Sequence, residues 1–416
     1  MTSDPREAYV WVWLPGRVEP VVAGRVYRDG DRLSFNYGRS YLERENAIPL
    51  YLPELPLRRG AIPPLPGLAL AGCLRDGAPD AWGRRVVLNR LLGARGAEPD
   101  VGQLDELTYL LQSGSDRPGA LDFQRSPTEY LARSPAGASL EQLLEAAALV
   151  EAGQSLPPSL DLTLFHGSSL GGARPKAEIE SNQRKYIAKF SSSTDTYNVV
   201  KAEYVAMRLA ARVGLRVAPV LLERVAGKDV LLVERFDRTR AESGWIRKAM
   251  VSALTLFGLD EMMARYASYE TLAEIIRHRF HEPAATLREL FGRLVFNVLC
   301  GNTDDHARNH AAFWDGGSLA LTPAYDICPQ ARTGNEASQA MLIDDSRRLS
   351  NLQVCRGAAR HFLLSLDQAG AIIDEQVALI RDNLPAVMEE AELGEVDRRF
   401  LTERVFLNPA VFEPAS

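Results

Sequence analysis

The hydrophobic period of the chain changes at about Glu234, and this change limits the folds that it can adopt. From about residue 138 to Glu234, short apolar runs and alternating patterns predict mostly β-strands. Beyond it, apolar residues recur every three or four positions through Leu272 to Phe280 and Leu287 to Leu299, which predicts helices. We therefore expect a strand-rich lobe, a helical lobe and a cleft.

A smaller α+β subdomain is expected ahead of these lobes. Tyr9 to Leu42 is typical of an antiparallel meander, because apolar and polar residues alternate after the Asp29-Gly30 turn. Six prolines between residues 49 and 66 lack amide donors and predict a connector without regular structure. Pro79 and Asp80 then favour the start of a helix that runs to about Leu92.

Residues 112–138 are rich in Ser, Gly, Pro and Arg, which is typical of a segment between domains. A helix is predicted directly after them, at Leu140 to Ala152. We predict an N-terminal subdomain with its connector at residues 1–138, an N-lobe at 139–238 and a helical C-lobe at 239–416. The chain of 416 residues is long enough for this many packed units.

Composition narrows the class of protein. With 46% apolar and 25% charged residues, the chain matches folded globular proteins rather than disordered ones. Its net charge of -6 argues against broad binding to nucleic acid. The four cysteines form no CxxC pair, charged residues occupy the start, and no run of eighteen uncharged apolar residues occurs. A cytoplasmic, soluble protein with reduced thiols and no membrane contact is expected.

Gly167 to Lys176 (GSSLGGARPK) is a glycine-rich segment between two apolar, strand-like stretches. Glycine lets backbone amides approach phosphate oxygens closely, and a following lysine neutralises them. Taken alone, the segment fits an ordinary surface turn better, because Gly-Ser loops are common. The residues that would bind ATP here are Ser168, Ser169, Gly171, Gly172 and Lys176.

Lys189 lies on a predicted strand, Tyr186 to Phe190, and points away from the apolar side chains of that strand. A buried ammonium needs an anionic partner. Nucleotide phosphates or Glu203, on a helix that begins near Asn198, would supply one in a kinase. An exposed lysine on an edge strand is an equal alternative.

The apolar strand Val230 to Phe236 becomes charged at its end, as expected where a buried strand enters a connector. Backbone groups of Glu234 and Phe236 would pair with adenine there, while the Phe236 ring packs nearby. On its own, an ordinary strand end explains this pattern better.

Gly301 to Asn309 (GNTDDHARN) carries the strongest chemical signal. Phosphoryl transfer needs a carboxylate base and oxygen ligands for Mg²⁺, and Asp304 and Asn309 have the five-residue spacing of a kinase base and its metal ligand. A predicted hairpin around residues 315–317 returns Asp326, a second metal ligand, towards Asn309.

Neighbouring residues leave alternatives open. Asp305 is a second candidate base, and two adjacent carboxylates raise one another's proton affinity. His306 fits a base or a zinc ligand, although a histidine in a polar loop more often orders backbone. No third histidine or cysteine near His310 completes a zinc motif, and no Gly-x-Ser-x-Gly element supports a serine hydrolase.

These residues resemble the HipA family of toxin serine/threonine kinases over nearly the whole chain. The segments that carry the resemblance are Gly167 to Lys176, Val233 to Arg238 (VERFDR), Gly301 to Asn309, Pro323 to Asp326, Gly114 to Leu121 (GSDRPGAL) and Leu74 to Arg84. The resemblance implies an α+β, two-lobed protein-kinase-like fold after a small α+β N-terminal subdomain.

The resemblance also implies roles for residues. Asp304 would be the base, Asn309 and Asp326 the Mg²⁺ ligands, and Lys189 the phosphate-binding lysine. Asp237 and His306 join the residues predicted to bind ATP. Ser169 falls where members of the family are autophosphorylated, which displaces the loop and switches the kinase off. Asp305 departs from the small residue that family members often have there.

Three functions remain open from sequence. The leading one is a protein kinase of a toxin-antitoxin pair, with a DNA-binding antitoxin as partner, contact with DNA only through that antitoxin, and an aminoacyl-tRNA synthetase or other translation component as a possible target. A small-molecule kinase would use the same residues. The third is a catalytically idle module that represses transcription with an antitoxin. Such a module would keep the fold without turnover, so the intact Asp304, Asn309, Asp326 and Lys189 argue against it.

Overall fold

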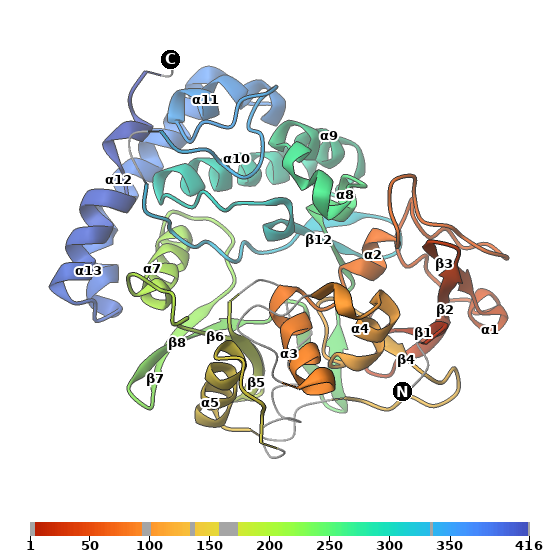
Figure 1. Ribbon diagram of the computed structural model, residues 1–416. Helices are drawn as coiled ribbons and strands as arrows, with labels where there is room; N and C mark the ends of the chain where they lie inside the picture. The colour runs from red at the N-terminus through yellow and green to blue at the C-terminus, as the bar shows by residue number, and fades with distance from the viewer. Residues whose placement is uncertain (1–4, 94–100, 134–137, 158–173, 333–335, 415–416) are drawn as a thin grey trace. The chain divides into compact units, whose positions relative to one another are not determined.

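The computed structural model describes residues 5–93, 101–133, 138–157, 174–332 and 336–414 (Figure 1). The chain forms two compact units. Unit 1 holds residues up to Thr194 together with 223–251 and 313–317, and unit 2 holds 195–222, 252–312 and the chain from 318 onwards. Across the part of the chain that the structure describes, no helix has both the length and the apolar character needed to cross a membrane.

The predicted meander is confirmed as three antiparallel strands in unit 1. They are β1 (Glu7–Val12), β2 (Val21–Asp29) and β3 (Arg32–Tyr37). A fourth strand, β4 (Leu121–Gln124), pairs with β1 and completes a sheet of order β3-β2-β1-β4. The sequence predicts only a connector at 112–138, and this was wrong for β4, because the buried Leu121 and Phe123 extend the sheet there.

The proline-rich connector is confirmed to lack helices and strands between residues 49 and 66. Short helices α1 (Arg39–Leu42) and α2 (Gly72–Arg75) flank it. Side chains hold its backbone instead of a ladder: the Tyr37 hydroxyl donates to the Leu55 carbonyl at 2.7 Å and accepts from the Leu50 amide at 2.9 Å. Backbone bonds contribute as well, because the Phe35 amide donates to the Ile62 carbonyl at 2.9 Å and the Ile62 amide donates to the Phe35 carbonyl at 2.7 Å. The connector is therefore ordered by side-chain hydrogen bonds and by this bridge.

Helices of unit 1 begin at polar caps. In α3 (Ala81–Leu92) the Asp80 carboxylate accepts from the Gly83 amide, which confirms the predicted helix. The helix predicted from Leu140 is confirmed as α5 (Leu140–Glu151), where Ser139 and Gln142 form a capping box. Between them lie η1 (Val101–Gln103) and α4 (Glu106–Gln112).

The second sheet of unit 1 contains β5 (Lys176–Ser181), β6 (Arg184–Phe190) and β8 (Lys228–Glu234), in the order β5-β6-β8-β7 with β7 (Val220–Val225) at the edge. β9 (Arg238–Ala241) and β10 (Gly244–Arg247) follow as an antiparallel pair. The face of β6 that carries Tyr186, Ala188 and Phe190 is buried, as its alternation predicts.

One apolar core joins this sheet to the N-terminal helices. Trp82 of α3 belongs to the same buried cluster as α5 and β6, and its Nε1 donates to the Lys176 carbonyl at 3.0 Å. The compact units therefore group the N-terminal part with β5, β6 and β8. The domain boundaries at 138 and 238 stay predictions.

Unit 2 is mostly helical, with α10 (Pro283–Leu299) at its core. From Leu290 to Leu299 every residue of this helix is buried, and α10 contacts α9, α11 and α12 (Figure 1). The other elements are α7 (Val199–Arg212), α8 (Ala253–Leu256), η2 (Glu261–Tyr266), α9 (Tyr269–Arg279), η3 (Ala307–Asn309), α11 (Leu352–Gly357), η4 (Ala358–Phe362), α12 (Leu366–Glu390), α13 (Glu395–Phe400), η5 (Leu401–Val405) and η6 (Pro409–Val411).

Three short strands complete the fold: β11 (Met250–Ser252), β12 (Ala311–Trp314) and β13 (Leu319–Leu321). The hairpin predicted around residues 315–317 is confirmed as β12 and β13. At its end the Thr322 amide donates to the Ala311 carbonyl at 3.0 Å. The chain then continues directly to Asp326.

Candidate active site

The predicted catalytic loop follows α10 through a left-handed turn at Gly301. This glycine has a φ of +71°, and a Cβ there would lie 3.2 Å from the Gln330 carbonyl oxygen. The Gln330 amide donates to the Gly301 carbonyl at 2.9 Å. Only glycine adopts this turn without strain, so the loop leaves the helix at a fixed angle.

Two buried asparagines hold the first residues of the loop. The Asn302 amide donates to the Asn297 carbonyl at 2.9 Å, and Asn302 Nδ2 donates to Asn297 Oδ1 at 3.0 Å. Sequence reasoning missed this pair. The available signal was Asn297 itself, a polar residue inside an otherwise apolar helical run.

Asp304 and Asn309 are in direct contact. The Asp304 carbonyl oxygen accepts from the His306 amide at 2.9 Å and from Asn309 Nδ2 at 3.1 Å. The second bond uses the side-chain nitrogen of Asn309, so the side-chain oxygen of this residue is the atom suited to bind a cation. The five-residue spacing thus brings the two predicted residues together.

Asp326 lies close enough to Asp304 for its charge to change the pKa of that residue. The preceding residue fixes the chain here, because the Tyr325 hydroxyl donates to the Arg308 carbonyl at 2.7 Å. Asp326 itself has a φ of +58°, a left-handed conformation that is uncommon for residues other than glycine. The structure therefore brings Asp304, Asn309 and Asp326 together.

Asp304 is an exposed side chain with an unfavourable electrostatic environment. Partial desolvation raises its pKa, and the negative charges of Asp326 and Asp305 raise it further, while His306 lowers it. A divalent cation held by carboxylate and amide oxygens would relieve this repulsion. The donors present are the hard oxygen ligands that Mg²⁺ prefers, so the residues fit that ion.

Asp305 has the opposite environment. It is 2% exposed, it accepts a hydrogen bond from the Tyr269 hydroxyl, and its Oδ1 lies 2.9 Å from His310 Nε2. Burial would raise its pKa, but His310 and Tyr269 lower the pKa overall. Because these partners occupy the Asp305 carboxylate inside the protein, Asp304 is the better placed base. Sequence reasoning missed the contact with Tyr269.

The residues predicted to bind nucleotide belong mainly to unit 1. Lys189 on β6 is half-buried, and Glu203 lies on α7 of unit 2, so their pairing stays a prediction. Lys176 is buried, and its Nζ lies 3.1 Å from the carboxylate that caps α3. Ser168, Ser169, Gly171 and Gly172 lie outside the described residues.

The end of β8 carries the residues predicted to contact adenine. The Glu234 carboxylate pairs with Arg184 at 2.6 Å, and the Phe236 ring packs edge-on against Phe313, with centroids 5.9 Å apart. Asp237 is 4% exposed and accepts from two arginines and a backbone amide. The roles of Asp237 and His306 in binding ATP stay predictions.

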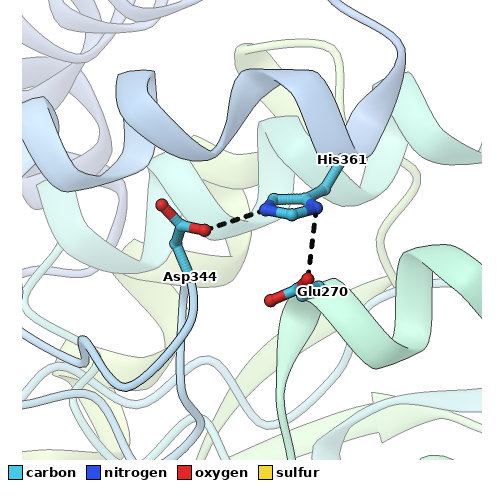
Figure 2. A group of neighbouring side chains, drawn as sticks. All are labelled: Glu270, Asp344 and His361. Carbon is cyan, nitrogen blue, oxygen red and sulfur yellow. Dashed lines mark hydrogen bonds and ion pairs between the residues drawn. The ribbon is translucent and has the colours of Figure 1, made fainter.

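A second cluster of possible ligands lies beside α9. Figure 2 shows His361 with one ring nitrogen towards Asp344, at 2.8 Å, and the other towards Glu270, at 3.6 Å. One ligand atom of each residue lies within 4.8 Å of the others. The Asp344 carboxylate, however, is already paired with Arg347 and Arg360 as well as with His361. We interpret the cluster as an ion-paired anchor.

This anchor holds a loop that also supports the catalytic loop. The Ala340 amide donates to the Thr303 carbonyl at 3.0 Å, and the Leu342 amide donates to the Ala267 carbonyl at 2.9 Å. Although burial opposes it, the hydrogen bonds from His361 and Arg347 lower the pKa of Asp344. The loop is thus held at residues 340, 342 and 344, and its Ala340 contacts Thr303, the residue before Asp304.

Known proteins share this sequence and fold. The family description "HipA-like C-terminal domain" matches residues 168–384, and "HipA N-terminal domain" matches residues 12–124. The protein Y4mE of Sinorhizobium fredii is named as a candidate kinase. It is 27% identical to this chain over 339 residues, and the match covers 76% of each of the two chains. The serine/threonine-protein kinase toxin HipA of Shewanella oneidensis is 24% identical over 202 residues, which are 42% of this chain and 47% of that protein.

The same fold occurs in a solved structure of the complex of HipA, HipB and its operator DNA from Shewanella oneidensis MR-1. The match covers 95% of this chain and 94% of that one, with a TM-score of 0.66 at 18% sequence identity. This likeness confirms the predicted α+β, kinase-like fold class.

Proposed function

The chain belongs to the HipA family of kinases, and we propose that it is an ATP- and Mg²⁺-dependent serine/threonine protein kinase that acts as the toxin of a toxin-antitoxin pair. One observation carries the proposal. Asp304 is exposed, its backbone is bonded to Asn309, and Asp326 is near enough to raise its pKa. A base beside two oxygen ligands is the constellation that phosphoryl transfer requires.

In this proposal each residue has a separate task. Asp304 accepts the proton of a serine or threonine hydroxyl and orients that oxygen. Asn309 and Asp326 hold Mg²⁺ through their side-chain oxygens. Lys189, Lys176 and the glycine-rich segment neutralise the phosphates, and backbone groups of Glu234 and Phe236 take the adenine. ATP supplies the phosphoryl group.

Partners and control follow from the family. HipA of Shewanella oneidensis occurs in a complex with HipB and operator DNA, so we propose a HipB-type antitoxin as partner, with DNA bound only through it. The substrate is a cellular protein. Autophosphorylation of Ser169 would switch the kinase off, because nearly two added negative charges oppose the binding of ATP phosphates.

The test is incubation of the purified chain with ATP labelled at the γ-phosphate, with Mg²⁺, and with or without cell lysate. We expect label on serine or threonine of one or a few lysate proteins, and on Ser169 of the chain itself. The matched control is the Asp304→Asn variant, in which transfer should fall by about 10²- to 10⁴-fold. Label that enters only small molecules would overturn the protein-kinase assignment, and absence of any transfer would leave an idle co-repressor.

A further inference from the structure

Two segments that carry the family resemblance, residues 114–121 and 233–238, contact each other inside unit 1. Arg235 donates to the carbonyl oxygens of Asp116 and Arg117 at 2.9 and 2.8 Å. Arg238 donates to the Gly119 carbonyl at 2.8 Å. Both guanidinium groups therefore donate hydrogen bonds to backbone carbonyls of the N-terminal segment, which lies about 120 positions earlier in the chain.

Carboxylates from both segments complete the contact. Asp116 accepts from Arg238 Nε at 2.8 Å and Nη2 at 2.6 Å, and it lies 3.2 Å from Arg235. Asp237 accepts from Arg235 Nη2 at 2.8 Å, from Arg238 Nη1 at 2.9 Å, and from the Gly119 amide at 2.8 Å. Planar guanidinium forks match such paired acceptors, and a lysine would not.

The network is buried, and its charged groups are paired with one another. Asp116, Arg235, Asp237 and Arg238 are each at most 7% exposed. Glu178 on β5 joins through Arg235 at 2.8 Å, and Lys185 on β6 pairs with Asp116. Arg235, Arg238 and Lys185 thus face three carboxyl groups, and burial together with the charge of Asp116 raises the pKa of one of them, Glu178, to about 8. Arg247 lies 4.0 Å from Asp116 on the margin. Burying this many charges is tolerable only when each is paired.

Arg235 stands between the two residues that the proposed function assigns to adenine. Its backbone amide donates to the Lys185 carbonyl at 2.8 Å, so both its main chain and its side chain are fixed. The flanking residues are held as well, through the Glu234 pair with Arg184 and the Phe236 contact with Phe313. The backbone groups for adenine are therefore oriented before a nucleotide arrives, which lowers the entropic cost of binding.

We propose that Asp116, acting through Arg235 and Arg238, positions the backbone of Glu234 to Phe236 for the adenine ring of the nucleotide. The N-terminal segment 114–119 is then a positioning part of the nucleotide site and has no contact with the nucleotide itself. This inference rests on the proposed function, because it takes the end of β8 as the adenine site.

A matched control, Asp122, lies six positions further along the chain. Asp122 is fully buried and, like Asp116, is held by two arginines: Arg117 Nε and Arg133 Nη2 both donate to it at 2.9 Å. The arginines lower the pKa of both carboxylates against the effect of burial. Among the described residues, Asp122 hydrogen-bonds to Ser115, Arg117, Arg133, Gln124 and Tyr130, and to none of residues 234–238.

The experiment compares Asp116→Asn with Asp122→Asn. Calorimetry measures the affinity of the full chain for ATP and ADP, and hydrogen exchange without nucleotide measures the opening of residues 234–238. We expect Asp116→Asn to weaken both nucleotides about tenfold, the effect of one misplaced charged hydrogen bond, and to speed exchange at 234–238. Asp122→Asn should leave nucleotide affinity within about twofold at a comparable loss of thermal stability.

Unchanged affinity in Asp116→Asn, or an equal loss in Asp122→Asn, would show that the network is structural only and overturn the inference. If Asp116→Asn does not fold, Arg238→Lys replaces it under the same criteria, because it keeps the charge and loses the fork. A wild-type chain that binds no nucleotide would overturn the proposed function instead, and the exchange comparison would still decide whether Asp116 orders residues 234–238.

Discussion

Two groups of acidic residues in this protein have opposite electrostatic environments. In unit 1, Asp116 and Asp237 each contact two arginines, and although burial opposes it, these contacts lower the pKa of Asp237 to about 2. In unit 2, Asp304 has Asp326 and Asp305 as neighbours, and desolvation together with their negative charge raises its pKa. The residue type is the same, and the partners differ.

The difference separates charges that stabilise the fold from charges kept for chemistry. A carboxylate that is fully paired with arginines has little further affinity for a proton or a cation. Carboxylates that repel one another retain that affinity, at some cost in stability. Even adjacent residues follow this division. His310 and Tyr269 pair with Asp305, whereas two of the charged neighbours of Asp304 among the described residues are carboxylates.

The largest expected effect comes from the unsatisfied group. Asp304→Asn should fold normally and lose phosphoryl transfer by about 10²- to 10⁴-fold, because the amide keeps the shape and accepts no proton. Single-turnover rates with labelled ATP measure it. Asp305→Asn should reduce the rate by less. If Asp305→Asn proves the more damaging change, Asp305 is the base and the comparison between the two carboxylates is inverted.

Next in size is the effect of Lys189 on nucleotide affinity. Lys189→Ala should weaken ATP binding about 10- to 100-fold, the usual range for a charged hydrogen bond to phosphate. The control is Lys228→Ala, which removes the same charge from an exposed position on the same sheet. Calorimetry measures the affinity of both variants for ATP in the presence of Mg²⁺. Equal affinities of Lys189→Ala and Lys228→Ala would show that Lys189 does not belong to the nucleotide site.

A smaller effect is expected on stability when the satisfied aspartate is changed. Asp305→Asn should lose about 1–3 kcal/mol of unfolding free energy at pH 7, because Tyr269 and His310 lose a charged acceptor. The folded-state pKa of Asp305 is lowered. Its contribution is therefore present above the unfolded value of about 4, and it disappears as the pH falls through the folded pKa. The difference between the urea midpoints of the two proteins should be largest at pH 7 and should narrow as the pH falls below about 4.

The smallest effect has the opposite sign. Because the folded-state pKa of Asp304 is raised, its charged form opposes folding at neutral pH, so Asp304→Asn should raise the melting temperature by about 1 °C in the absence of Mg²⁺. The gain should vanish below about pH 4, where Asp304 is protonated in both states. Calorimetric scans of both proteins at pH 7 and pH 4 measure the difference in melting temperature. A lower melting temperature of Asp304→Asn at pH 7 would contradict the inference that the charge of Asp304 destabilises the fold.

Local signals in the sequence were sufficient for most elements. Caps and periodicity located α3, α5 and α10, and the spacing of Asp304 and Asn309 brought these two residues into contact as predicted. Strand β4 escaped because its four residues lie in a polar segment and become a strand only by pairing with β1, a contact across about 110 positions.

The buried charge network was not predicted from the sequence, for the same reason. The sequence indicates no partner for Asp116 or Arg235, and only their contact across the fold explains their burial. Tyr269 gave no signal for its bond to Asp305, because tyrosine in an amphipathic helix is usual in any core. Interactions between distant segments depend on the tertiary fold, which no local pattern encodes.

Trp82 has a consequence for how such chains can be divided or recombined. Its ring fills a position in the core formed by α5, β5 and β6, and its indole N-H is bonded to β5. A fragment that starts at residue 139 would keep the kinase motifs and leave this position empty, exposing apolar surface and an unpaired carbonyl to water. Exchange of N-terminal parts between relatives should therefore succeed only when the residues around this ring are transferred together with it.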